Sequence, residues 1–229
     1  YARLQPASFY SVELSHTFKQ KFVSSFTYGI NKGIITQVIQ PSETEDSVTV
    51  QTDKNLDQMI FIGISGAYPF TIAKWWNNVT NFNIYYAKYQ GNIANTPLNN
   101  GGPTFDFSTT NSFLLPKGFS AELGGYYQAR QVYGYMNVNP NWMLNFGIQK
   151  LFLDKRATLK FNFQDIFWSG YPSASSRYIG YTEYFIAQRE TRVATISFTY
   201  RFGKRTVPPS RNHRGGAEDE KKRATSSGA

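Results

Sequence analysis

Residues 192–202 alternate between two kinds of side chain, and this period of two constrains the fold more than any other feature of the sequence. The even positions carry Ala194, Ile196, Phe198, Tyr200 and Phe202, and the odd positions carry Val193, Thr195, Ser197, Thr199 and Arg201. Such alternation indicates a β-strand with one apolar and one largely polar face. A soluble sheet with one buried face shows this pattern, and so does a transmembrane barrel strand between lipid and water. The rest of the chain decides between them.

The same alternation recurs along the chain and predicts an all-β protein. With residues 192–202, the segments 8–18, 22–38, 56–68, 75–90, 104–115, 119–138, 142–152 and 157–168 make nine expected strands. The connections at 19–21, 69–74, 116–118 and 153–156 are short, those at 39–55, 91–103 and 169–190 are longer, and 139–141 is an exception. Short periplasmic turns and long extracellular loops are typical of outer-membrane barrels. We therefore predict an antiparallel transmembrane β-barrel with 39–55, 91–103, 139–141 and 169–190 extracellular, and with residues 178–188 extending the flanking strands.

The distribution of positive charge supports the barrel. The net charge is +9, but the basic residues lie at strand ends and form no continuous stripe with interleaved aromatics, so we expect no nucleic-acid partner. The short turns share a positive charge, carried by Lys19, Lys21, Lys74, Lys117, Lys155 and Arg156, and Lys204 and Arg205 follow the last strand. A soluble β-sandwich gives no reason for this bias, whereas turns that meet an anionic lipid surface do.

Composition agrees with a barrel in the cell envelope. No run approaches the roughly 18 apolar residues of a transmembrane helix. Aromatic residues make up 17% of the chain, yet the mean hydropathy is −0.43, as expected where half of each strand faces water. Cysteine is absent, which excludes disulfides and thiolate metal sites.

The number of strands bears on how the barrel is completed. Bacterial single-chain barrels have an even number of strands and begin and end in the periplasm. An odd count, together with the missing signal peptide, predicts further strands before Tyr1; a miscount by one would instead allow a complete barrel of about ten strands. We expect residues 1–203 to be the C-terminal part of the barrel. Residues 204–229 are expected to form a polar, flexible periplasmic tail, because they contain almost no apolar residue to bury.

Two C-terminal segments resemble a known family. Gln164-Asp165-Ile166-Phe167 followed by Tyr171 resembles a segment of the penultimate strand of TonB-dependent receptors, and residues 198–204 resemble the end of that family's outer-membrane barrel. The resemblance implies the last nine or so strands of a barrel of about 22, in the outer membrane of a Gram-negative bacterium. It also implies an upstream plug and TonB box, the TonB energy-coupling protein as partner, and uptake of a nutrient ligand.

Other functions stay open beside nutrient uptake. A barrel that no longer transports would serve as a structural platform in a larger membrane assembly, with a surface lipoprotein or another assembly partner. A soluble β-rich binding module is a third alternative. Neither His16 nor His213 has an obvious Ser and carboxylate partner, and no phosphate loop or zinc spacing occurs, so we expect neither enzymatic activity nor a cofactor.

The candidate site residues follow from the two strand faces. Alternation places five charged residues toward the lumen, where they line a ligand path, hold a plug or simply keep the wall wet: Glu13, Asp106, Glu122, Arg130 and Arg201. It places four residues of the last strand toward lipid, where they form an assembly signal: Ile196, Phe198, Tyr200 and Phe202. The loop acids Glu43, Glu45, Asp46 and Asp53 are hard oxygen ligands suited to calcium, but solvated loops often look the same, so we expect no metal site.

Overall fold

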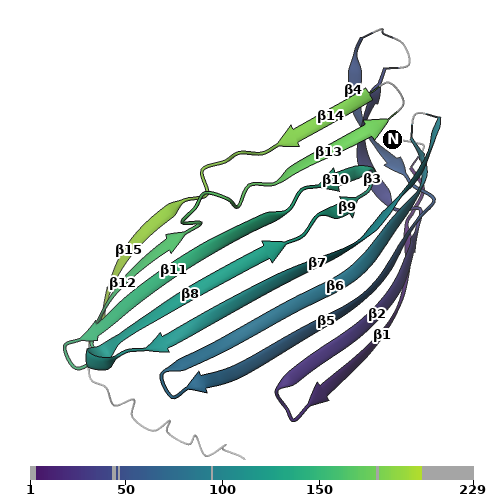
Figure 1. The fold of residues 1–229 in the computed structure, drawn as a ribbon. Helices are drawn as coiled ribbons and strands as arrows, with labels where there is room; N and C mark the ends of the chain where they lie inside the picture. Colours follow the sequence, from purple (N-terminus) through teal and green to yellow (C-terminus); the bar gives the residue numbers. More distant parts are fainter. Residues whose placement is uncertain (1–3, 43–44, 46, 94, 179–180, 203–229) are drawn as a thin grey trace, which may run out of the picture. The chain divides into compact units, whose positions relative to one another are not determined.

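The principal element of the fold is one large sheet. The computed structural model describes residues 4–42, 45, 47–93, 95–178 and 181–202, and the chain divides into two compact units, Tyr1–Thr199 and Tyr200–Ala229. In the first unit a nine-stranded sheet has the order β1-β2-β5-β6-β7-β8-β11-β12-β15. Its strands are β1 (Ser8–Phe18), β2 (Phe22–Lys32), β5 (Gln58–Ala73), β6 (Trp76–Ile93), β7 (Thr96–Leu114), β8 (Phe119–Gln128), β11 (Asn141–Phe152), β12 (Ala157–Gln164) and β15 (Val193–Tyr200). The nine predicted strands are confirmed, and the sheet is curved (Figure 1).

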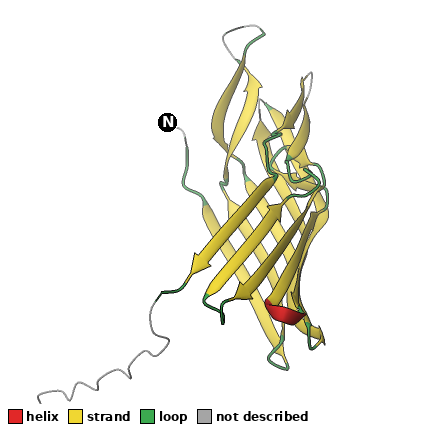
Figure 2. Cartoon of the chain, turned by 90° about the vertical axis from the view of Figure 1, so that its left-hand side faces the viewer, coloured by secondary structure: helices red, strands yellow, loops and turns green. Residues whose placement is uncertain are grey.

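The short connections lie together at one end of the sheet, as predicted (Figures 1 and 2). Lys19 and Gln20 both have positive φ, which suits a tight turn between right-twisted strands, and the Lys21 amide donates to the Phe18 carbonyl at 3.1 Å. Between β7 and β8 the chain forms the short 3₁₀ helix η1 (Pro116–Gly118). Among the described residues no helix is long and apolar enough to span a membrane.

The long connections contain strands where loops were predicted. The segment 39–55 contributes most of a two-stranded sheet formed by β3 (Ile35–Pro41) and β4 (Thr49–Asn55). A four-stranded sheet combines β9 (Gln131–Tyr133), β10 (Met136–Val138), β13 (Ser173–Tyr178) and β14 (Tyr181–Ile186) in the order β14-β13-β10-β9. The predicted loop 91–103 belongs to the long hairpin β6–β7, with Ile93 opposite Thr96.

Two predicted strands were too long because each one runs on into strands that belong to a small sheet. The segment 22–38 is β2 followed by β3, which leaves the principal sheet to pair with β4. The segment 119–138 is β8 followed by the β9–β10 hairpin. The connection between β8 and β11 is therefore long. The prediction of a short loop at 139–141 is wrong, and this connection is no exception to the pattern of long connections at that end of the sheet.

A small buried core lies at the end with the long connections. Its buried members come from β3, the connection between β4 and β5, β6 and the β9–β10 turn: Val38, Leu56, Ala87, Tyr89, Ile93 and Tyr135. Val38 is fully buried and Leu56 is only 1% exposed. We call this group the cap core, because it packs the β3–β4 hairpin and the β9–β10 hairpin against the principal sheet.

The two outer strands of the principal sheet are edges. Both β1 and β15 run toward the end with the short connections (Figure 1). Their apolar side chains are among the most exposed of the described residues, with Leu14 at 71% and Ile196 at 73%. Within the described residues, the sheet is thus open along β1 and β15.

Candidate functional site

The strand registers give the principal sheet two chemically distinct faces. Residues directly opposite each other in an antiparallel pair have their side chains on the same face. Leu14 lies opposite Phe26, Phe26 opposite Ile64, and Ile64 opposite Ile84. The row continues through Phe105 of β7. We call this the apolar face; it also carries Tyr127, Trp142, Phe146, Phe161 and Phe163 on the later strands.

The other face carries an unbroken row of polar side chains. Following the registers from β1 to β11, the residues opposite one another are Ser15, Ser25, Ser65, Asn83, Asp106, Gln128 and Asn141. Two neighbouring pairs in this row are hydrogen-bonded: the Ser15 and Ser25 hydroxyls are 2.8 Å apart, and the Asn83 amide donates to the Asp106 carboxylate at 2.8 Å. We call this surface the polar face.

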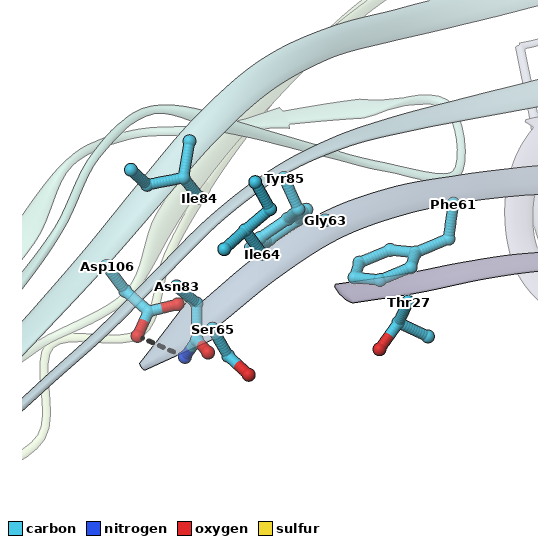
Figure 3. Close-up of a pocket in the computed structure, with 9 residues that line it drawn as sticks. All are labelled: Thr27, Phe61, Gly63, Ile64, Ser65, Asn83, Ile84, Tyr85 and Asp106. Carbon is cyan, nitrogen blue, oxygen red and sulfur yellow. Dashed lines mark hydrogen bonds between the residues drawn. The ribbon is translucent and has the colours of Figure 1, made fainter. Parts of the chain in front are cut away.

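A groove of about 300 Å³ lies on the polar face around Asp106 (Figure 3). Ser65, Asn83 and Asp106 supply its polar groups, and Phe61 and Tyr85 supply aromatic walls. Gly63 is required here, since a Cβ would come within 2.8 Å of the Tyr85 Cβ. The groove can accept hydrogen bonds at the carboxylate and pack a ring or aliphatic segment beside it.

A second groove on the polar face, of about 250 Å³, lies closer to the short connections. Glu122 and Lys160 line it together with the amides Gln149 and Asn162. Glu122 is opposite Ser112 and Gly147, and Gly147 is opposite Asn162. Side chains of both charges therefore face the same hollow, which suits a polar solute rather than an apolar one.

The cap core covers the polar face at the end with the long connections. Its members Ala87 and Tyr89 lie on the polar face of β6, in the same alternation as Tyr85. The Tyr85 hydroxyl donates to the Gln131 side chain of β9, and the Asn100 amide donates to the Gly134 carbonyl at 3.2 Å. These bonds attach the β9–β10 hairpin to the wall of the sheet.

A third hollow, of about 330 Å³, lies between the β3–β4 hairpin and the four-stranded sheet. It is lined by Thr36, Gln37, Ile39, Gln51, Tyr133, Tyr135, Met136, Glu183 and Phe185. The Tyr135 hydroxyl accepts from the Ile39 amide at 3.3 Å and donates to Glu183 at 3.5 Å. Glu183 is the only charged group in this lining, which therefore favours neutral or positively charged ligands.

Asp165 follows β12 directly and holds the connection between β12 and β15 together by hydrogen bonds. Its carboxylate accepts the amides of Ser169 and Gly170 at 2.9 and 2.8 Å and the hydroxyl of Thr191, which precedes β15. The side chain is 2% exposed. Burial alone raises the pKa of the Asp165 carboxyl, but the hydrogen bonds from Thr191, Ser169 and Gly170 outweigh it and hold the pKa below its ordinary value.

The structure brings three of the five predicted lumen residues onto the polar face. Glu13 accepts a hydrogen bond from Ser15 at 2.8 Å and lies opposite Thr27, which lines the Asp106 groove. Asp106 and Glu122 lie in the first and second grooves. Arg130 lies between β8 and β9, and Arg201 follows β15, so neither belongs to a strand of the principal sheet.

The residues predicted to face lipid lie on or just after β15. The Phe198 ring packs against Phe152 of β11 with centroids 6.1 Å apart, which places the even positions of β15 on the apolar face. Tyr200 ends the strand, and its ring meets that of Phe202 edge to face at 4.7 Å. Their role as an assembly signal stays a prediction.

No metal centre is formed by the part of the chain that the structure describes, where no three His, Cys, Asp or Glu residues lie close enough to share an ion. Glu43 and Asp46 of the candidate calcium loop lie outside the described residues, as does the tail from residue 203. Asp53 lies on β4 and the Glu45 amide donates to Ser42 at 3.2 Å. The expectation that this loop holds no metal ion therefore stays a prediction.

Sequence reasoning missed the cap core and the third hollow. Glu183 and Gln51 come from connections predicted as loops, and Tyr135 comes from the segment 119–138, which was predicted as one strand. No packing was inferred from any of them. The alternation of the β3 and β4 segments could have shown the hairpin, but the charges of 49–55 obscured it.

Comparison with known families places these surfaces in a membrane context. Residues 2–200 match the family model described as the outer membrane protein beta-barrel family. Among curated proteins, none matches the sequence.

Proposed function

The chain belongs to the outer membrane protein beta-barrel family, and from this premise we propose that it forms part of a receptor barrel for TonB-dependent uptake of a nutrient ligand. Location in the outer membrane follows from the family. The proposal of uptake rests on one observation above all, the unbroken polar row from Ser15 to Asn141 on a sheet whose other face is apolar. The resemblance of residues 164–171 and 198–204 to TonB-dependent receptors is the reason for proposing that TonB provides the energy for uptake.

The two faces fit a water-filled lumen surrounded by lipid. A barrel strand in the outer membrane presents apolar residues outward and polar residues inward. In the described strands, Glu13, Asp106, Glu122 and Lys160 are on the polar face, whereas the charged residues of the apolar face are lysines. We therefore assign the polar face to the lumen and the apolar face to lipid.

The open edges require further strands. Unpaired strand edges are not tolerated in hydrocarbon. Because β1 and β15 run in the same direction, joining them to each other would create a parallel pair in an otherwise antiparallel sheet. An odd number of additional strands between them restores antiparallel pairing, which supports a place in a larger barrel.

The three hollows lie along the route that we propose for a polar ligand. The lining with Glu183 lies at the end with the long connections, which we place outside the cell, and the grooves of Asp106 and Glu122 follow along the lumen wall. Carboxylates and amides along this path accept hydrogen bonds from hydroxyl or amine groups. The basic short connections then lie on the periplasmic side.

Uptake by intact cells tests the proposal. Cells lacking this gene, and cells lacking the TonB-type coupling protein, are grown on a defined mixture of nutrients, and the solutes left in the medium are measured by mass spectrometry. We expect the same solute to remain in both cultures, and an Asp106→Asn, Glu122→Gln double variant to slow its removal. Unchanged depletion without this gene would contradict uptake and favour the structural platform.

A further inference from the structure

Lys150 is a charged residue in an apolar environment. It lies on β11 opposite Phe119 of β8 and Leu159 of β12, and Ile148 and Phe152 flank it on the same face of its own strand. Its ammonium lies 4.7 Å from the centroid of the Phe119 ring, within the range of a cation–π contact. Lys32 and Lys88 are the other charged residues on this face of the described principal strands, and both lie near the long connections.

Three further cations lie at the same end as Lys150. Lys117 belongs to η1, and Lys155 and Arg156 belong to the turn between β11 and β12. The two turns are neighbours: Gly118 has φ +77°, and a Cβ added there would lie 2.7 Å from the Leu151 carbonyl oxygen. All four basic side chains are exposed. Asp154 offsets part of this charge, so the patch is positive but not purely so.

An apolar shelf adjoins the cations. Ala157, which is fully buried, lies opposite Phe152, and the Phe152 and Phe198 rings meet at 6.1 Å. Leu159, beside Lys150 on the next strand, is 45% exposed. Positive charge and exposed hydrocarbon are therefore continuous on one surface, which is the combination that an amphiphile with an anionic head requires.

We propose that Lys150, Lys117, Lys155 and Arg156 bind the phosphate of one anionic phospholipid, whose acyl chain lies along Leu159 and the Phe152–Phe198 pair. A lysine on a lipid-facing wall directs its ammonium to the headgroup layer, where an anionic lipid compensates the charge. Free phosphate would use only the cations and leave the apolar shelf uncovered. The site depends on the apolar face meeting lipid and is independent of transport.

Lipid titration by native mass spectrometry tests the site. The intact protein is purified in a neutral detergent, delipidated, and titrated with phosphatidylglycerol or with phosphatidylcholine of the same chain length. Lys150→Gln should weaken phosphatidylglycerol binding about five- to tenfold and leave phosphatidylcholine binding unchanged. Lys150→Arg should retain binding. Lys88→Gln is the matched control, because it removes a lysine from the same face near the other end.

Several outcomes would overturn the site. These are equal losses for Lys150→Gln and Lys88→Gln, equal affinities for the two lipids, or displacement of phosphatidylglycerol by millimolar inorganic phosphate, which would indicate a free-phosphate site. If Lys150→Gln does not fold, as judged by heat-modifiable migration, the triple variant Lys117→Gln, Lys155→Gln, Arg156→Gln leaves the apolar face intact and should show the same selective loss. A triple variant with unchanged affinity would also contradict the proposal.

Discussion

The two ends of the principal sheet are built by different means. At the end with the short connections, tight turns such as Lys19–Gln20 close hairpins through local backbone geometry, and the side chains there are exposed and basic. At the other end, Val38, Leu56 and Tyr135 form a buried core from segments far apart in the sequence. The comparison shows that the local sequence pattern determines the strands of the principal sheet. Contacts between segments far apart in the chain determine which hairpins cover it.

The largest effect should come from the cap core. Leu56→Ala removes a side chain that is 1% exposed and leaves a cavity, which should destabilise the cap by about 2–5 kcal/mol. Hydrogen exchange of the β3–β4 and β9–β10 backbone amides in the intact protein measures the change. The matched control is Leu153→Ala in the short turn, where the side chain is 59% exposed and the expected change is within about 0.5 kcal/mol. Equal effects at both ends would contradict the comparison.

In the part of the principal sheet between its two ends, the effect of a substitution on stability should depend on which face of the sheet carries it. Ile196→Arg places a charge on the apolar face and should cost about 2–4 kcal/mol if the residue lies near the bilayer midplane. Ser197→Arg, one residue on, points to the polar face and should be tolerated. Urea titration of the protein folded in vesicles measures both. Cysteines at the two positions provide a second readout, since a water-borne thiol reagent should label position 197 and not 196.

The sequence predicts the structure better at the end with the short connections than at the end with the long connections. Residues 8–18 were predicted as a strand from alternation alone, and β1 has those bounds. The Asn, Gly and Pro residues of 99–103 indicated a loop, yet Pro103 pairs with Tyr86 and Gly101 with Lys88. The β7–β8 pairing begins at Asp106, so Pro103 lies where β7 is an edge, and the missing amide breaks no bond on that side. Pairing across the long hairpin overrides local preference there.

The candidate site was predicted only where it depends on alternation. Alternation predicted Asp106 and Glu122 on the polar side of their strands, and both lie on the polar face; their position in a lumen stays a prediction. Glu183 and Tyr135 meet because β14 and the β9–β10 hairpin join one four-stranded sheet, which no period in the sequence reveals. Asp165 was noticed through a resemblance, but its partners Ser169, Gly170 and Thr191 follow from the folded connection alone.

Substitution of Asp165, at the start of the long connection between β12 and β15, should reduce stability by an intermediate amount. Asp165→Asn replaces an accepting oxygen with an amide that faces the N–H and O–H donors, and it should cost about 1.5–3 kcal/mol. Asp57→Asn, at an exposed carboxylate, is the control, with an expected change within about 0.5 kcal/mol. Thermal unfolding of the intact protein measures both.

The pH dependence of this contribution has a defined sign. The folded pKa of Asp165 lies below its unfolded value, so the stabilisation is complete above the unfolded pKa of about 3.9. It is lost as the pH falls through the folded pKa. The difference between the natural protein and Asp165→Asn should therefore be constant at neutral pH and shrink only in acid. A difference that shrinks between pH 6 and 8 would assign the effect to another group.

The smallest effect should come from a single basic turn. If the short connections meet an anionic lipid surface, Lys21→Gln should weaken that association by about 1 kcal/mol, because each lysine near such a surface contributes about that much. The change should appear when the intact protein is inserted into vesicles with phosphatidylglycerol and vanish in phosphatidylcholine or high salt, since salt screens exposed charges. Lys54→Gln, on β4 at the other end, is the matched control. If Lys54→Gln had the larger lipid-dependent effect, the anionic surface would lie at the end with the long connections, and the proposed orientation of the barrel would be reversed.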